Sequence, residues 1–272
     1  MKTKILFVSI FCLVFCNVVF AQEVFKNADL TISKLDQGVW VVETADMTTM
    51  YIIEGEERAM LIDTGTQCEA LDETIRKITD KPLYVVITHN HGDHSGNIRY
   101  FDEVYMHPLD TVIPVKIPFT GKYNWINDGD VFDLGGRIIE AIWLPGHTPG
   151  SIVLLDKTIG VCYTGDTFGS GQVWLQLMPH LPMSTYYKSC IRMEEIMKDQ
   201  HITKVYCGHY PYLKRALDLN YIADMKELAK KLIDGDTSSS KPYDRKVGIV
   251  EKPAFVQKGD AVIVYDSENI NR

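Results

Sequence analysis

Three histidines and one aspartate fall within six positions of the chain, in the segment THNHGDHSG at residues 88–96. In extended backbone His89 and His91 point to the same side, and the turn that Gly92 permits brings Asp93 and His94 to a neighbouring point. Imidazole and carboxylate groups at this density are typical of a site for zinc, iron or a similar metal. The alternative is a polar loop with incidental histidines, but the whole chain has only eight.

Three further candidate ligands each follow an apolar, strand-like run and lie beside a glycine. His147 lies in the turn LPGHTPGS, Asp166 follows the run at residues 159–163, and His209 follows the run at residues 205–207. Each alone is a weak signal, because an isolated Gly-Asp-Thr is usually a turn and an isolated histidine at a strand end is usually structural. Together with the first cluster they predict a metal site built from loops at one edge of a sheet scaffold.

The four motifs together resemble those of the metallo-β-lactamase-fold hydrolase superfamily, which includes glyoxalase II-type thioesterases, lactonases and phosphodiesterases. The resemblance covers nearly all of the chain after its first residues and implies two metal ions. His89, His91 and His147 would hold the first ion; Asp93, His94 and His209 would hold the second; Asp166 would bridge both.

An earlier motif, MLIDTG at residues 60–65, matches the position where the family carries an aspartate that orients the metal-binding loop. The resemblance therefore implies an outer, supporting role for Asp63. The alternative is a plain turn residue after a strand.

Elements that would position these residues can be read from the apolar pattern. Strands are expected at residues 29–34, 39–43, 50–54, 59–62, 83–87, 137–143, 151–156, 159–164, 203–206 and 260–266, and helices at 68–79, 184–198 and 217–234. With the resemblance, this order implies an α/β (α+β) fold, a four-layer αββα sandwich of two mixed sheets flanked by helices. Residues 22–272 are expected to form one domain.

Residues 1–21 have the pattern of a signal peptide: Lys2 and Lys4, an apolar stretch, and the ending Val19-Phe20-Ala21. The pattern predicts a secreted or periplasmic protein without stable membrane insertion after cleavage, the alternative being an uncleaved anchor. The formal charge is −8, and loss of this segment removes two lysines and no acid. Such an acidic chain argues against a nucleic-acid partner.

Four cysteines follow the predicted signal peptide: Cys68, Cys162, Cys190 and Cys207. Their spacing shows no disulfide framework, and whether any of them pair stays open. Cys207 lies close to His209 in sequence, but a complete ligand set exists without it.

The predicted chemistry is hydrolysis of an ester, thioester, lactone or amide bond of a small molecule by a hydroxide held between two divalent ions. Zinc is expected, with iron or manganese as alternatives. Asp93 would orient the nucleophile and shuttle a proton, and Asp166 stands where some β-lactamases of the family carry cysteine or serine. Trp174, in an apolar loop at residues 168–183, and Tyr210 are the candidate substrate contacts. The alternative is that both side chains only pack against the fold.

Three alternatives remain open. The first is β-lactamase activity. The second is an iron-dependent oxidoreductase resembling the persulfide dioxygenases, which share the pattern His-x-His-x-Asp-His. The third is a non-catalytic protein that keeps its metals structurally. The sequence leaves the oligomeric state undetermined.

Overall fold

The computed structural model describes residues 22–115, 118–169, 171–245 and 250–271. The predicted signal peptide at residues 1–21 lies outside the described residues. Within them, no helix is both long and apolar enough to cross a bilayer.

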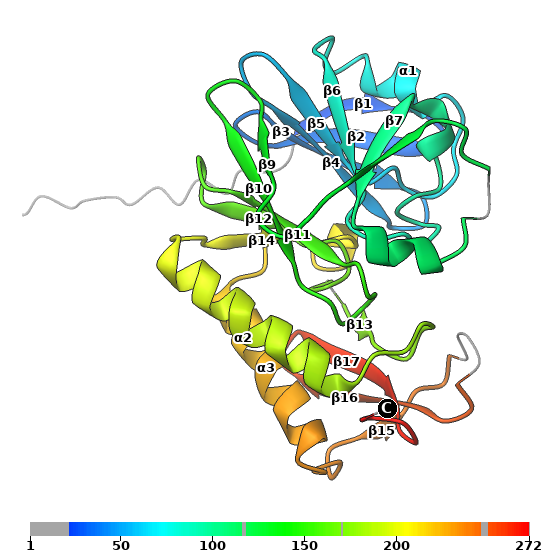
Figure 1. The fold of residues 1–272 in the computed structure, drawn as a ribbon, viewed down its shortest axis with the longest axis vertical. Helices are drawn as coiled ribbons and strands as arrows, with labels where there is room; N and C mark the ends of the chain where they lie inside the picture. The colour runs from blue at the N-terminus through cyan, green and yellow to red at the C-terminus, as the bar shows by residue number, and fades with distance from the viewer. Residues whose placement is uncertain (1–21, 116–117, 170, 246–249, 272) are drawn as a thin grey trace, which may run out of the picture.

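An eight-stranded sheet forms the N-terminal half of the fold, with its strands in chain order (Figure 1). Its first five strands run antiparallel, and β5 to β8 are parallel neighbours. The strands are β1 (Gln22–Lys26), β2 (Leu30–Asp36), β3 (Val39–Thr44), β4 (Thr49–Glu54), β5 (Ala59–Ile62), β6 (Leu83–Val86), β7 (Glu103–Met106) and β8 (Lys122–Trp125).

A second sheet has five strands in the order β14-β12-β11-β10-β9, and its β12 and β14 run parallel. The strands are β9 (Val131–Asp133), β10 (Ile138–Trp143), β11 (Ile152–Asp156), β12 (Val161–Tyr163) and β14 (Lys204–Tyr206). The two sheets bury their facing apolar side chains in one core, in which Tyr51 of β4 packs against Tyr163 of β12. Burial of this apolar surface is the main force that holds the sheets together.

Helices cover the outer face of each sheet (Figure 1). The short helix α1 (Leu71–Ile75) and the 3₁₀ turn η1 (Ile98–Tyr100) pack on the first sheet. Helices α2 (Met183–Asp199) and α3 (Leu219–Ile233) pack on the second. Two more 3₁₀ turns, η2 (Pro108–Val112) and η3 (Tyr210–Tyr212), follow β7 and β14. This order of layers confirms the predicted αββα sandwich.

A third sheet, of which the sequence predicted only the strand at residues 260–266, packs on α3 at the C-terminal end of the molecule. Its order is β13-β17-β16-β15, from strands β13 (Val173–Trp174), β15 (Lys241–Pro242), β16 (Pro253–Lys258) and β17 (Ala261–Asp266). The strands β1, β7, β8 and β9 are also absent from the predicted set. None has more than five residues, and each has at most two buried side chains, so they carry little apolar pattern.

The helix expected at residues 68–79 is much shorter than predicted. It begins after Ala70, which has the left-handed φ of 46°, and it ends at Ile75. Beyond Ile75 the backbone tightens, because Lys77 and Ile78 donate to the carbonyls of Thr74 and Ile75 in the three-residue spacing of a 3₁₀ turn. The other two predicted helices agree with α2 and α3 within two residues at each end.

The four cysteines of the described chain are buried and no disulfide joins them, so the disulfide left open by the sequence is not formed. Burial raises the pKa of the Cys68 thiol to about 11, with the Asp29 carboxylate as a further cause. These thiols serve as small apolar side chains in the core.

One buried ion pair ties the two sheets together. Arg137 Nε donates to Asp156 Oδ2 at 2.7 Å, and Arg137 Nη1 donates to the carbonyls of Gly38 and Glu54 in the first sheet at 3.0 and 3.1 Å. Both side chains of the pair are less than a tenth exposed.

We expect Arg137→Met to lower the free energy of unfolding by about 3–5 kcal/mol, because it leaves the Asp156 carboxylate buried without its partner. Denaturant unfolding measures this change. Arg192→Met is the matched control: Arg192 pairs with Asp128 in an exposed site, where a loss below about 1 kcal/mol is expected. Equal losses in the two variants would contradict this role for Arg137.

Candidate metal centre

All seven candidate ligands lie in loops that leave the strands at one edge of the two inner sheets. His89, His91, Asp93 and His94 follow β6, His147 joins β10 to β11, Asp166 follows β12 and His209 follows β14. Neighbouring parallel strands end at the same edge of a sheet. The loop after β6 therefore lies beside the loop after β5, and the loop after β12 lies beside the loop after β14. The predicted ligands therefore come together from four separate segments.

The seven side chains form two groups, and within each group the ligand atoms lie within 4.8 Å of one another. In the first group, His147 Nε2 lies 3.0 Å from His91 Nδ1 and 3.2 Å from His89 Nε2. Three imidazole nitrogens thus face one point, which is the donor set of a histidine-bound zinc site.

The second group consists of Asp93, His94, Asp166 and His209. Asp166 Oδ1 lies 3.4 Å from His94 Nε2, and Asp166 Oδ2 lies 3.2 Å from His209 Nε2. The same Oδ2 is 3.8 Å from His147 Nε2 of the first group. Asp166 therefore contacts both groups, as its predicted bridging position requires.

Each of four imidazoles has a partner for its second ring nitrogen. His94 Nδ1 faces Asp63 Oδ2 at 2.8 Å, and His89 Nδ1 lies 3.2 Å from Thr88 Oγ1. The carbonyls of Trp174 and Met47 accept from His147 and His209, at 2.8 and 3.2 Å from Nδ1. These partners fix the ring orientations and leave Nε2 facing the centre.

Asp63 lies beside the residues that it was predicted to support, and the role itself stays a prediction. Its side chain accepts hydrogen bonds from the backbone N–H and the hydroxyl of Thr88, directly before His89, and contacts His94. It has the left-handed φ of 62°, strained for a residue with a side chain. Burial raises its pKa, against the opposing effect of His94.

Burial and charge separate the two groups electrostatically. Burial lowers the pKa of His91 to about 3 and that of His89 well below its ordinary value, so the first group is neutral at physiological pH, as metal ligands must be. Burial opposes the charged form of His94 as well, but Asp166 and Asp63 raise its pKa well above the ordinary value. The second group therefore stabilises the protonated, positively charged form of His94 next to the carboxylates of Asp166 and Asp63.

Two buried polar atoms are a second observation that fits a metal centre. Among the described residues, His94 Nε2 and Asp166 Oδ1 are buried and make no well-formed hydrogen bond, although they face each other at 3.4 Å. Buried polar atoms are almost always satisfied, so this pair indicates a ligand such as a cation.

Gly208 makes the close approach of these loops possible. A Cβ at this position would lie 2.4 Å from Asp166 Oδ1 and 2.6 Å from His94 Cε1. Only glycine fits there, directly before His209.

No motif in the sequence indicates the role of Asp110 in η2. Its buried carboxylate accepts from the backbone N–H of Asn90 at 2.8 Å, and from Thr148 Oγ1 at 3.0 Å and the N–H of Gly150. It thereby joins the loop of His89 and His91 to the loop of His147. Asp110 is remote from both loops in sequence; the only available signal was an acid in a short run after the strand-like residues 103–106.

The two residues predicted to contact substrate, Trp174 and Tyr210, have different surroundings. Trp174 contributes its backbone carbonyl to His147, while its ring packs near Tyr243 and Arg245. The Tyr210 ring packs toward Tyr206 and the two cores. Contact of either side chain with substrate stays a prediction. Tyr212, which the sequence analysis missed, is half exposed and has its ring 5.9 Å from that of His209.

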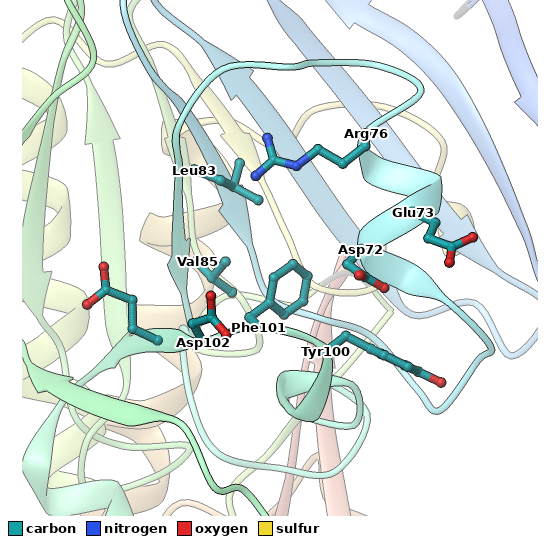
Figure 2. A pocket seen from close by; sticks show the side chains of 9 residues that line it. Asp72, Glu73, Arg76, Leu83, Val85, Tyr100, Phe101 and Asp102 are labelled. Carbon is teal, nitrogen blue, oxygen red and sulfur yellow. The ribbon is translucent and has the colours of Figure 1, made fainter.

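Two of the hollows in the described part of the chain bear on where substrate could bind. One, of about 390 Å³, is lined by Asp93 and Gly92 together with Asp46, Thr66, Gln67 and Val115, and it opens at the second ligand group. The other, of about 530 Å³, lies between α1, η1 and the strands β6 and β7, with Phe101, Leu83 and Val85 on its floor (Figure 2). None of the seven candidate ligands lines the second hollow, so the first is the candidate substrate cleft.

Comparison with known proteins gives a consistent result. The family model for the metallo-beta-lactamase superfamily matches residues 44–209. The acyl-coenzyme A thioesterase MBLAC2 of Homo sapiens is 26% identical over 62% of this chain and 75% of its own length. The hydroxyacylglutathione hydrolase of Vibrio campbellii is 25% identical over 64% of this chain and 62% of its own.

Solved structures share the fold. The metallo-beta-lactamase FIM-1 of Pseudomonas aeruginosa, in its mono-zinc form, superposes with a TM-score of 0.60 over 76% of this chain and 97% of its own, at 18% identity. ETHE1 of Myxococcus xanthus superposes with a TM-score of 0.52 over 78% and 84%, at 21% identity.

We expect Asp110→Ala to weaken metal binding by about 10- to 100-fold, because the loops of the first group lose their shared anchor. Competition with a chromophoric zinc chelator measures this affinity. Asp128→Ala is the control, since Asp128 also accepts from a backbone N–H near the turn, at Trp143, but is exposed. A folded Asp110→Ala protein with unchanged zinc affinity would refute the anchoring role.

Proposed function

The chain belongs to the metallo-beta-lactamase superfamily of metal-binding hydrolases, and we propose that it is a dizinc thioesterase that acts on small acyl thioesters outside the cytoplasm. The observation that carries the proposal is the pair of ligand groups joined by Asp166, which contacts His94, His147 and His209. Each group offers at least three ligand atoms, so the two groups together can hold two ions.

The residues that would hold the ions are those of the two groups, with Asp166 between them. Two bound zinc ions would supply Lewis acidity and a water that is deprotonated near neutral pH. Nitrogen-rich ligand sets with a few carboxylates suit zinc, and this set has five imidazoles and two carboxylates.

Asp93 is the candidate for proton transfer. Its side chain is 40% exposed, lines the cleft, and has Oδ2 at 3.6 Å from His209 Nε2 and 3.8 Å from His94 Nε2. It can therefore orient a water in the cleft, accept a proton from it, and return that proton to the departing sulfur. In the reaction the water oxygen bonds to the acyl carbon and the C–S bond breaks. One water proton reaches the sulfur through Asp93, the other leaves to solvent, and a carboxylate and a thiol are released.

Two kinds of relative support thioesters over the other bonds. The names of two relatives, an acyl-coenzyme A thioesterase and a hydroxyacylglutathione hydrolase, describe hydrolysis of acyl thioesters. Each aligns with more than half of this chain. Asp166 in place of a cysteine or serine supports the same choice over β-lactams.

Export is part of the proposal. It rests on the lysines, apolar stretch and Val-Phe-Ala ending of residues 1–21. Mass spectrometry of the protein recovered from its native cell should find Gln22 at the N-terminus; an intact Met1 would refute cleavage.

We expect purified protein to contain two zinc ions per chain and to hydrolyse acyl thioesters, with activity lost to a chelator and restored by zinc. Elemental analysis and a thiol-release assay measure both. A folded, zinc-loaded sample that cleaves no thioester would overturn the proposal. One iron per chain with oxygen uptake would establish an oxidoreductase instead.

Asp93→Asn should lower kcat by about 10²–10⁴-fold, because the amide cannot accept the proton. Asp102→Asn is the matched control, because Asp102 lines a different hollow, to which none of the seven candidate metal-binding residues contributes (Figure 2). An Asp93→Asn enzyme with wild-type kcat would exclude Asp93 from proton transfer.

A further inference from the structure

The candidate substrate cleft contains a second carboxylate, Asp46, that belongs to neither ligand group. Asp46 and Asp93 both line the hollow of about 390 Å³ that opens at the second group. Asp46 is exposed, so a molecule in the cleft can reach its carboxylate. Because the two ligand groups are complete without it, its charge can act on the substrate instead.

The backbone places Asp46 beside the second ligand group. It lies in the turn between β3 and β4, and the carbonyl of the next residue, Met47, accepts a hydrogen bond from His209 Nδ1 at 3.2 Å. The turn is tight, because Met47 has a left-handed φ of 68° and its N–H donates to the carbonyl of Thr44 at 3.0 Å. The turn that carries Asp46 is therefore fixed against one of the candidate metal ligands.

Hydrogen bonds from two segments hold the Asp46 carboxylate in place. Its Oδ1 accepts from the hydroxyl of Thr44, at the end of β3, and its Oδ2 accepts from the hydroxyl of Thr66, in the segment after β5. Partial burial raises the pKa of Asp46, but these bonds and those from Thr48 outweigh it and lower the pKa below its ordinary value. Asp46 therefore presents a fixed negative charge at physiological pH.

The described residues of the cleft offer no positive charge to neutralise Asp46. Apart from the two acids, the cleft is lined by Thr66, Gln67, Gly92, Ser95, Gly96 and Val115. The hydrogen bonds that Asp46 accepts within the described chain all come from threonines. A cationic group on a bound molecule is therefore attracted to Asp46, and an anionic group is repelled.

We propose that Asp46 is a specificity-determining residue, which favours thioesters that carry an ammonium group over thioesters that are neutral or anionic. The ammonium group of the substrate lies against the Asp46 carboxylate, while the thioester carbonyl lies at the metal centre. Asp93 cannot supply the same preference, because bound zinc would offset its charge. The inference rests on the proposed thioesterase function and narrows its substrate class.

The first test uses two pairs of thioesters in which a quaternary nitrogen is replaced by carbon. Butyrylthiocholine and S-(3,3-dimethylbutyl) thiobutyrate form the pair with the ammonium group on the thiol. The S-ethyl thioesters of 4-(trimethylammonio)butanoic acid and 5,5-dimethylhexanoic acid form the pair with the ammonium group on the acyl chain. Each kcat/KM is divided by the rate constant for alkaline hydrolysis of the same thioester, which removes differences in intrinsic reactivity.

We expect the zinc-loaded enzyme to prefer the charged member of at least one pair by about tenfold or more. The pair that shows the preference identifies the end of the substrate that reaches Asp46. Cleavage without a preference in either pair would overturn the inference, while the thioesterase function would stand.

Asp46→Asn removes the charge and keeps the shape of the side chain. It should lower kcat/KM for the preferred charged thioester about tenfold more than for its neutral partner. Asp133→Asn is the matched control: Asp133 is exposed and also accepts from a backbone N–H, but it does not line the cleft. Equal losses on the two thioesters, or an unchanged preference, would contradict the role of Asp46.

Salt dependence tests the same charge in the unaltered protein. The preference should fall several-fold between about 20 mM and about 500 mM sodium chloride, because dissolved ions screen the attraction between exposed charges. A preference that salt leaves unchanged would arise from shape rather than charge and would overturn the inference.

If the wild type cleaves none of the four thioesters, the proposed function fails, and the uncleaved compounds then test the cleft alone. Broadening of the trimethylammonium proton signal of butyrylthiocholine measures its binding by NMR, and the tert-butyl signal of the neutral partner gives the comparison. Tighter binding of the charged compound that Asp46→Asn abolishes supports the inference. Equal binding of the two compounds, or binding of neither, overturns it.

Discussion

Crowding of imidazole nitrogens is the constraint around which this protein is organised. His147 Nε2 lies within 3.2 Å of nitrogens from two other histidines, and Asp166 is held among three imidazoles. Such lone pairs do not attract one another, so the surrounding fold must hold the loops against their own repulsion. Two carboxylates, those of Asp63 and Asp110, hold the loops by hydrogen bonds, and the backbone carbonyls of Trp174 and Met47 orient two of the histidines. Gly208 allows the close approach because it has no Cβ.

The chemistry was readable from the sequence because it resides in residue type and short spacing. His89, His91, Asp93 and His94 are adjacent, and each remaining ligand follows a recognisable apolar run, so strand-end geometry brings all seven together. Their service as metal ligands is still a prediction from this geometry. The long helices and buried strands were predicted for the same reason, since their apolar periodicity is strong.

What could not be predicted depends on partners distant in the chain. Asp110 resembles any acid in a turn until the fold brings Asn90 and Gly150 to it. The carbonyls of Met47 and Trp174 leave no trace in a sequence, because every residue has one. The short strands β7 to β9, β13 and β15 lack apolar periodicity of their own and are fixed by neighbouring strands.

The contact between His147 and β13 has an evolutionary consequence. The family match ends at residue 209, whereas the third sheet is built largely from residues beyond it. Since the anchor is a main-chain oxygen, mutation can replace the Trp174 indole, or rebuild the C-terminal sheet around β13, without withdrawing support from the histidine. The sequence of the C-terminal sheet can therefore diverge while the main-chain support of His147 is kept.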